Sequence, residues 1–119
     1  MEEIVDIKIS SEDSVAVVAF KAASISDVEG IATASKQIKE FVDENHPNRL
    51  IFDFNGVKFF SSLVLGVLLE VRSKLASYNG EVAISAINPQ LHKVFKITNL
   101  DKIFNFFPDK ETAVSAVSN

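Results

Sequence analysis

The chain has 119 residues, of which 47% are hydrophobic and 24% are charged, and this size and composition predict a single domain over residues 1–119. It has no cysteine, which excludes disulfides, thiolate nucleophiles and thiolate metal sites. A net charge of −4 without a basic run argues against nucleic acid as a partner. The start of the sequence does not resemble a secretory signal, and no apolar stretch reaches membrane-spanning length, so we expect a cytoplasmic protein without membrane insertion.

Two apolar-rich runs, residues 4–9 and 15–20, open the sequence on either side of a short polar segment, as in a β-hairpin. Ser26 and Glu29 then form a capping box, in which each side chain satisfies a backbone amide at the start of a helix. This helix is expected to end before His46. Its apolar face, at helical spacing, consists of Val28, Ile31, Ala32, Ser35, Ile38 and Phe41.

The second half of the sequence alternates strands with helices. Residues 50–54 are almost continuously apolar, as in a strand covered on both faces, and a turn at 55–56 follows. A long helix is predicted from about 62 to 78, with Asn79-Gly80 as its left-handed cap. Shorter elements follow: a strand at 81–87, a helix from Pro89 to Asn99 with Asn88 as its cap, a strand at 103–107, and a helix from Pro108 to Val117.

This alternation predicts the fold class. The order β-β-α-β-α-β-α-β-α is typical of an α/β domain with a mostly parallel sheet, to which the initial hairpin adds an antiparallel element. We therefore expect one α/β domain with a mixed sheet of four to five strands and about four helices.

Few side chains in the sequence suggest catalysis. His46 lies beside a proline, and His92 falls opposite the apolar face of its predicted helix, so both are expected at the surface. Asp53 either caps the turn at 55–56 or serves as a functional carboxylate. The sequence contains no phosphate-binding glycine loop, nucleophile elbow or metal-spaced cluster. We therefore expect a protein that docks onto another protein, not an enzyme, and no metal or cofactor.

The helix at 62–78 has an unusual apolar pattern. A continuous stripe at helical spacing is expected to face the sheet: Val64, Leu68, Val71, Leu75 and Tyr78. Leu63 and Val67 flank this stripe. The side chains expected on the far side are those of Ser62, Leu65, Gly66 and Leu69. Either another element of the chain covers this far side, or it is an exposed patch for a partner. Gly66 favours close approach of another backbone, because a glycine within a helix costs about 1 kcal/mol relative to alanine.

Two serines precede this helix, and we expect different roles for them. Ser61 stands where an N-cap belongs, with its hydroxyl accepting a hydrogen bond from a backbone amide. Ser62 then occupies the first turn and is directed to solvent. The alternative is that both serines are present only as caps.

Two segments carry a family resemblance. Residues 53–69, Asp-Phe-Asn-Gly-Val-Lys-Phe-Phe-Ser-Ser-Leu-Val-Leu-Gly-Val-Leu-Leu, align without a gap to the pattern D-L-S-G-V-x-F-x-D-S-S-G-L-G-V-L-L. That pattern is typical of the STAS domain of bacterial anti-sigma factor antagonists. Residues 88–104 are similar to the family's stretch after its fourth strand. The chain thus resembles this family over nearly its whole length.

The resemblance implies a function and a site. Ser62 aligns with the serine that the partner kinase phosphorylates in this family, and Ser61 replaces the preceding aspartate. Leu63 and Val64 replace a second serine and a glycine, and residues 21–27 replace the usual Gly-Glu-Leu-Asp run. The expected function is binding to an anti-sigma factor that is a serine protein kinase, with release on phosphorylation of Ser62 or, less favoured, Ser61. The candidate partner-binding residues are Asp27, Ser61, Ser62, Leu63, Leu65, Gly66 and Leu69.

Two further functions fit a STAS domain. One is a scaffold or assembly subunit that binds its partner without phosphorylation, and the other is a regulatory module that binds a small ligand. Homodimerisation is open in each case.

Overall fold

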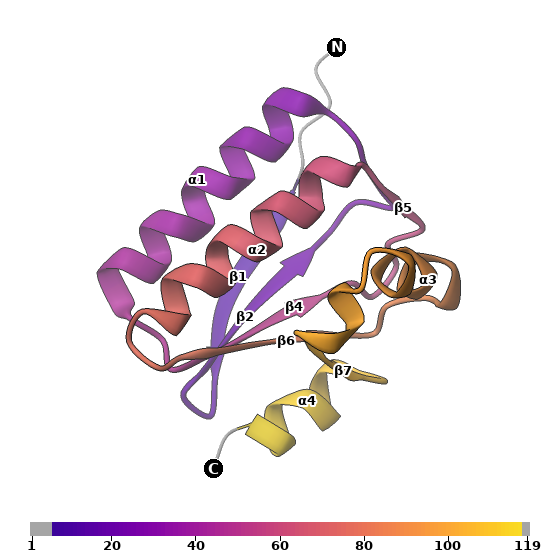
Figure 1. Ribbon diagram of the computed structural model, residues 1–119. Helices are drawn as coiled ribbons and strands as arrows, with labels where there is room; N and C mark the ends of the chain where they lie inside the picture. The colour runs from indigo at the N-terminus through magenta and orange to yellow at the C-terminus, as the bar shows by residue number, and fades with distance from the viewer. Residues whose placement is uncertain (1–5, 118–119) are drawn as a thin grey trace.

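Strands and helices alternate along the computed structural model, which describes residues 6–117 (Figure 1). The strands are β1 (Ile7–Glu12), β2 (Val15–Phe20), β3 (Ser24–Ile25), β4 (Arg49–Asp53), β5 (Phe59–Phe60), β6 (Glu81–Ser85) and β7 (Asn105–Phe107). The helices are α1 (Val28–Asn45), α2 (Ser62–Ala76), α3 (Pro89–Ile97) and α4 (Lys110–Val117), with a short 3-10 helix η1 (Leu100–Lys102). The expected α/β class, with a mixed five-stranded sheet and four helices, is confirmed.

The main sheet has the strand order β1-β2-β4-β6-β7. β1 and β2 form the expected antiparallel hairpin, while β2, β4, β6 and β7 run parallel. The hairpin turn consists of Asp13 and Ser14, both at positive φ, a backbone twist that matches the twist of the strands. Residues 4 and 5 of the first predicted run lie outside the described residues.

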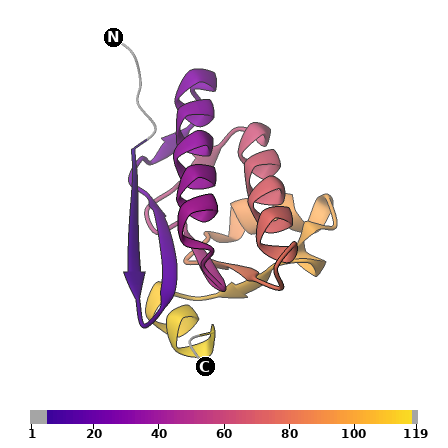
Figure 2. The same cartoon turned by 90° about the vertical axis from the view of Figure 1, so that its left-hand side faces the viewer.

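Helices cover both faces of this sheet. α1 and α2 lie side by side over one face, and α3 lies beside α2, whereas α4 packs on the opposite face (Figures 1 and 2). Alternate residues of β2 enter the two cores, with Ala16, Val18 and Phe20 on the α1–α2 side and Val15 and Val17 on the α4 side. The inner residues of the central strands are therefore apolar on both faces, as the sequence predicted for residues 50–54, although β4 begins with Arg49 and ends with Asp53.

Several boundaries differ from the predictions. α2 ends at Ala76 and not at Tyr78, and α3 ends at Ile97 because Asn99 takes a positive φ and leads into η1. The last strand begins at Asn105, two residues after the predicted start at Ile103. β6 ends at Ser85 because Ala86 has a positive φ and leaves the strand. The strands β3 and β5, each of two residues, were not predicted at all.

The start of α1 corrects the predicted capping box. Asp27, not Ser26, is the N-cap, since its carboxylate accepts a hydrogen bond from the Gly30 amide at 2.7 Å. The buried face is rotated accordingly, because Val28 is 64% exposed and Ala32 is exposed. The buried residues of α1 are Ile31, Ala34, Ser35, Ile38 and Val42.

The predicted helical phase of α2 is confirmed. Val64, Leu68, Val71 and Leu75 are buried, whereas Tyr78 is half-buried beyond the end of the helix. Leu68 is 0% exposed, and its neighbour Leu69 is 36% exposed. The predicted orientation of Leu65 is wrong, however, because this side chain is 8% exposed. Leu65 lies on the same side of α2 as Arg72, whose Nε donates to the Ile103 carbonyl at 3.2 Å. The segment after η1 thus lies against α2 at Arg72, and of the predicted far side only Leu65 is buried, while Ser62, Gly66 and Leu69 stay exposed.

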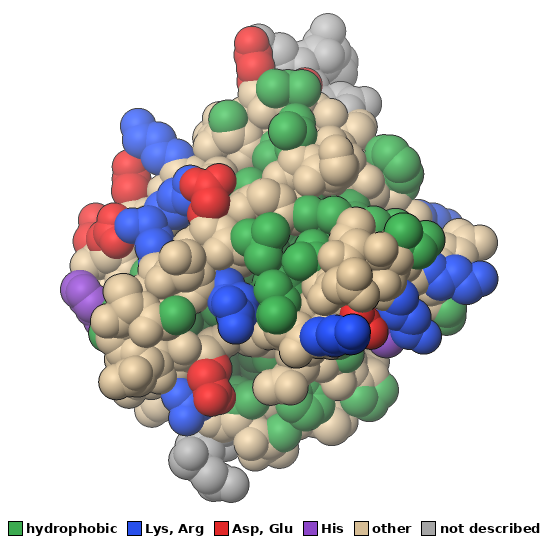
Figure 3. Space-filling model, viewed as in Figure 1, with side chains coloured by type: hydrophobic (Ala, Val, Ile, Leu, Met, Phe, Trp, Pro, Cys, Tyr) green, Lys and Arg blue, Asp and Glu red, His purple; other side chains and the backbone are tan. Residues whose placement is uncertain are grey.

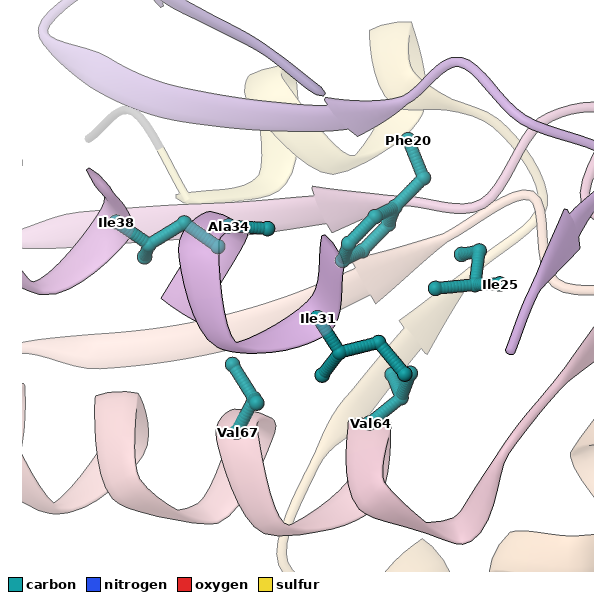
Figure 4. A pocket seen from close by; sticks show the side chains of 7 residues that line it. All are labelled: Phe20, Ile25, Ile31, Ala34, Ile38, Val64 and Val67. Atoms are coloured by element: carbon teal, nitrogen blue, oxygen red, sulfur yellow. The ribbon is translucent and has the colours of Figure 1, made fainter. Parts of the chain in front are cut away.

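An apolar seam and two ion pairs join α1 to α2. The side chains of Ile31, Ala34 and Ile38 face Val64 and Val67 around a small cavity that Phe20 and Ile25 complete (Figure 4). Outside this seam, Lys39 pairs with Glu70 and Lys74 pairs with Asp43. At the far end, the Tyr78 hydroxyl donates to the Pro47 carbonyl at 2.9 Å, and burial raises the pKa of this tyrosine. The two helices thus form one rigid layer over the sheet.

Truncation of the α2 stripe is expected to destabilise the protein strongly. Leu68→Ala removes a fully buried side chain and should lower the free energy of unfolding by about 2–5 kcal/mol. Leu69→Ala is the matched control and should lower it by less than about 1 kcal/mol, because Leu69 is partly solvated. Urea denaturation measures both values, and equal losses would contradict the assigned orientation of α2.

The observed cap of α1 leads to a second stability test. Asp27→Ala should lower the free energy of unfolding by about 0.5–2 kcal/mol, because it leaves the Gly30 amide without its acceptor. Ser26→Ala should change it by no more than about 0.5 kcal/mol, because Ser26 is exposed and does not cap α1. If thermal denaturation shows the larger loss for Ser26→Ala, the helix begins one residue earlier in solution.

Candidate functional site

The short strands β3 and β5 bring the starts of α1 and α2 to one end of the molecule. They pair in parallel, with Ile25 opposite Phe60. The Ser61 amide extends this pairing by donating to the Ile25 carbonyl at 2.8 Å. Ile25 and Phe60 are both buried, so the pair is anchored in the core. Asp27 and Ser61, the two N-caps, therefore follow neighbouring strands (Figure 1).

The two serines at the start of α2 have different environments. Ser61 is half-buried, and its hydroxyl accepts a hydrogen bond from the Leu63 amide at 3.1 Å, which confirms the predicted N-cap. Ser62 is exposed, and its hydroxyl makes no hydrogen bond with any residue from 6 to 117. Of the two hydroxyls, that of Ser62 is the one a partner enzyme can reach without breaking the cap.

Exposed apolar side chains surround the start of α2. Phe59 is 53% exposed and Leu63 is 47% exposed, although both lie next to core residues. Val28, the first residue of α1, is 64% exposed. Phe59 and Val28 were not predicted as site residues; Phe59 points outward because β5 alternates and Phe60 points inward. Hydrophobic side chains are visible on this end of the surface (Figure 3).

The remaining predicted partner-binding residues are arranged as follows. Gly66 is exposed one turn after Ser62, and a Cβ atom added to it would meet no described atom within 4 Å beyond its chain neighbours and its own helix backbone. Leu69 is partly exposed further along α2. Leu65 is buried and offers little area to a partner. Asp27 is half-buried, and one carboxylate oxygen is engaged in capping α1.

The residues that suggested acid–base chemistry have structural roles. Asp53 accepts hydrogen bonds from the Asn55 amide at 3.3 Å and the Ser85 hydroxyl at 3.0 Å, which confirms its predicted role in the turn. His46 is exposed, as expected. His92 is half-buried and not fully at the surface, since its ring packs on Phe106 at a centroid distance of 4.4 Å. These three side chains lie on different elements and do not form one cluster.

Residues 6–117 offer neither a metal site nor a membrane-spanning helix. No group of three His, Cys, Asp or Glu side chains in this range is arranged to hold a metal ion. None of the helices in this range is both long and apolar enough to cross a membrane. The start of α2 is therefore the candidate site that the geometry supports best.

Comparison with known proteins identifies the family. The STAS domain model matches residues 7–113, so the chain belongs to the STAS domain family. A STAS-domain containing protein of Pseudomonas aeruginosa is 26% identical over 58 residues, which are 49% of this chain and 57% of that protein. The matched region thus spans little more than half of that relative.

Solved structures show the same fold. An anti-sigma factor antagonist STAS domain protein from Planctomyces limnophilus superimposes with a TM-score of 0.85 at 20% identity, covering 96% of this chain and 98% of that one. An anti-sigma factor antagonist from Mycobacterium paratuberculosis gives a TM-score of 0.83 at 26% identity, covering 97% and 95%. The expected resemblance to this family is confirmed.

The two serines are expected to differ in their effect on stability. Ser61→Ala removes the cap of α2 and should lower the free energy of unfolding by about 1 kcal/mol. Ser62→Ala should leave it nearly unchanged, because the Ser62 hydroxyl makes no hydrogen bond within the described chain. Urea denaturation of both variants provides the measurement; a larger loss for Ser62→Ala would show that the cap has been assigned to the wrong serine.

Proposed function

We propose that this protein is an anti-sigma factor antagonist that binds a serine-kinase anti-sigma factor and acts without catalysing a reaction. The observation that carries the proposal is the exposed hydroxyl of Ser62, which makes no hydrogen bond with residues 6–117, in a segment where Phe59 and Leu63 are also exposed. Apolar side chains of this kind gain from burial against a partner, at about 25 cal/mol per Å² removed from water. A kinase that docks here has a phosphate acceptor within its contact area.

Phosphorylation of Ser62 would release the partner while the fold persists. A phosphoserine carries a charge of about −1.5 to −2 at neutral pH. At the start of α2 this charge is locally favourable by about 0.3–1 kcal/mol, and the first turn of this helix contains no acidic residue to oppose it. When a partner is bound, however, the phosphate would be buried among apolar side chains and lose its hydrating water. Without hydrogen-bond donors from the partner, this loss costs several kcal/mol. The penalty at the interface exceeds the local gain, so binding is lost and the protein stays folded.

A second function, a permanent complex that needs no phosphorylation, is favoured by one observation. Leu63 is apolar and 47% exposed at a position where the family resemblance places a second serine. A leucine there adds apolar contact area beside Ser62. Ser61, which replaces the family's aspartate, is engaged as a cap. Under this alternative the same end of the molecule binds a partner, and Ser62 stays unmodified.

Binding of a small ligand receives less support from the seam between α1 and α2. The cavity there is lined by apolar side chains and offers about 10 Å³, which is the room that about one water molecule needs. A regulatory ligand does not fit in it.

Variants of Ser62 test the proposed switch. Ser62→Asp should weaken binding of the anti-sigma factor at least tenfold, or about 1.4 kcal/mol, because a carboxylate then lies in the apolar contact. Its thermal stability should be nearly unaltered, since an acid in the first turn of a helix is favourable. Ser62→Ala should bind normally and resist release by kinase and ATP. A binding titration by calorimetry measures each affinity.

Ser61→Ala is the control and should affect binding less than stability. Mass spectrometry after incubation with the kinase and ATP identifies the modified residue. Normal binding by Ser62→Asp would place the start of α2 outside the interface and remove the proposed switch. A complex that forms without any phosphorylation of wild-type protein would support the permanent complex instead.

A further inference from the structure

The outer face of α3 combines unpaired positive charge with an exposed apolar side chain. Lys93, Lys96 and Ile97 fall on one side of this helix, opposite its buried residues Leu91 and Phe95. Both lysines are exposed, and Ile97 is 81% exposed. α3 contains no acidic residue. This face is therefore both basic and apolar.

The same character continues across η1 to α2. Lys102 is exposed at the end of η1, and Ile103 next to it is 37% exposed. The hydrogen bond from Arg72 to the Ile103 carbonyl holds this segment against α2, where Leu69 lies one turn before Arg72. We call the surface formed by Leu69, Lys93, Lys96, Ile97, Lys102 and Ile103 the α3 surface. In Figure 3, several basic side chains and one acidic side chain lie over α3 and the segment after it, beside hydrophobic side chains next to α2.

The charges of the α3 surface contrast with those on α1 and α2. On those helices Lys36, Lys39 and Lys74 each form an ion pair with an acidic residue. Lys93, Lys96 and Lys102 form none with any residue from 6 to 117. Asp101, next to Lys102 in η1, is the acidic residue of this segment; it is half-buried and forms no ion pair with a described lysine. The three exposed lysines outnumber this one carboxylate, so the surface keeps a local positive potential in a chain of net charge −4. An acidic surface is the complement of this potential.

α3 packs next to the segment that leads to the proposed site at the start of α2. The ring of Phe60, which lies between the exposed Phe59 and the cap Ser61, contacts the ring of Phe95 in α3 with centroids 6.0 Å apart. The cap residue of α3, Asn88, donates to the Val57 carbonyl just before β5 at 3.1 Å. On the outside, Leu69 belongs both to the α3 surface and to the candidate partner-binding residues of α2, so one partner that contacts Leu69 reaches both regions.

We propose that the α3 surface is a second docking region, which binds an acidic segment with apolar side chains on the same anti-sigma factor. This inference rests on the proposed function. The apolar side chains Ile97, Ile103 and Leu69 would be buried by the partner's apolar residues, while the lysines face its carboxylates. Charges at the rim of an interface act mainly on the association rate and on its salt dependence, and buried apolar contacts act mainly on dissociation. The contribution of the lysines can thus be measured from the association rate, and that of the apolar side chains from the dissociation rate.

The test is surface plasmon resonance of the full chain with the anti-sigma factor at 50 and 300 mM salt. The double variant Lys93→Glu/Lys96→Glu should associate at least tenfold more slowly than wild type at low salt and lose most of the salt dependence of association. The control Lys8→Glu/Lys36→Glu makes the same change in net charge at exposed lysines of β1 and α1, and should stay within twofold of wild type. Ile97→Ser should dissociate about fivefold faster with an unchanged melting temperature, because Ile97 is 81% exposed.

The outcomes separate this inference from the proposed function. If the wild type binds and the α3 double variant matches it, or weakens no more than the control, the second docking region is wrong while the proposed function stands. If the wild type does not bind the anti-sigma factor at all, both are wrong. Sedimentation with phosphatidylglycerol vesicles at 150 mM salt tests whether the α3 surface binds a membrane instead of a protein. Vesicle binding that Lys93→Glu/Lys96→Glu abolishes would assign the surface to lipid and overturn the proposal.

Discussion

The parallel pairing of β3 with β5 is the constraint on which the candidate site depends. Each strand has only two residues, yet the pairing fixes where α1 and α2 begin relative to each other. It does so because its inward residues, Ile25 and Phe60, are both core residues. With these two buried, the alternation of a strand turns Phe59 outward. Phe59 is thus exposed next to the serines because Phe60 and Ile25 are buried in the core.

The elements that depend on neighbouring residues in the sequence were predicted correctly. The hairpin, the parallel strands and the buried stripe of α2 follow from periodicity, and the Asn88-Pro89 start of α3 follows from capping chemistry. The cap of α1 was misplaced because Ser26 and Asp27 both satisfy the sequence rule for a cap. The choice between them depends on where β3 ends, and β3 ends where its pairing with the distant strand β5 ends. The residues next to Ser26 and Asp27 do not contain this information.

The errors at the candidate site have a common cause, which is contact between distant segments. Leu65 was placed outward because the periodicity of its own helix cannot show that distant parts of the fold bury it. β3 and β5 are too short to show an alternating pattern. The basic character of the α3 surface was also missed, because Lys93 and Lys96 are ordinary in sequence and only the ion pairs elsewhere make them unusual. In each of these three errors, the structure depends on contacts between residues that are far apart in the sequence.

Gly66 leaves a position without a side chain on the exposed face of α2. It lies one turn after Ser62, and a methyl group there would meet nothing within 4 Å among residues 6–117, apart from its chain neighbours and the backbone of its own helix. The missing side chain is thus not needed for packing, and it even lowers the intrinsic helix propensity by about 1 kcal/mol relative to alanine. What it creates is a notch in the helix surface, bordered by the larger side chains of Leu63 and Leu69. A protruding side chain of a bound protein could enter this notch and lie directly against the helix backbone, closer than any position with a Cβ atom allows.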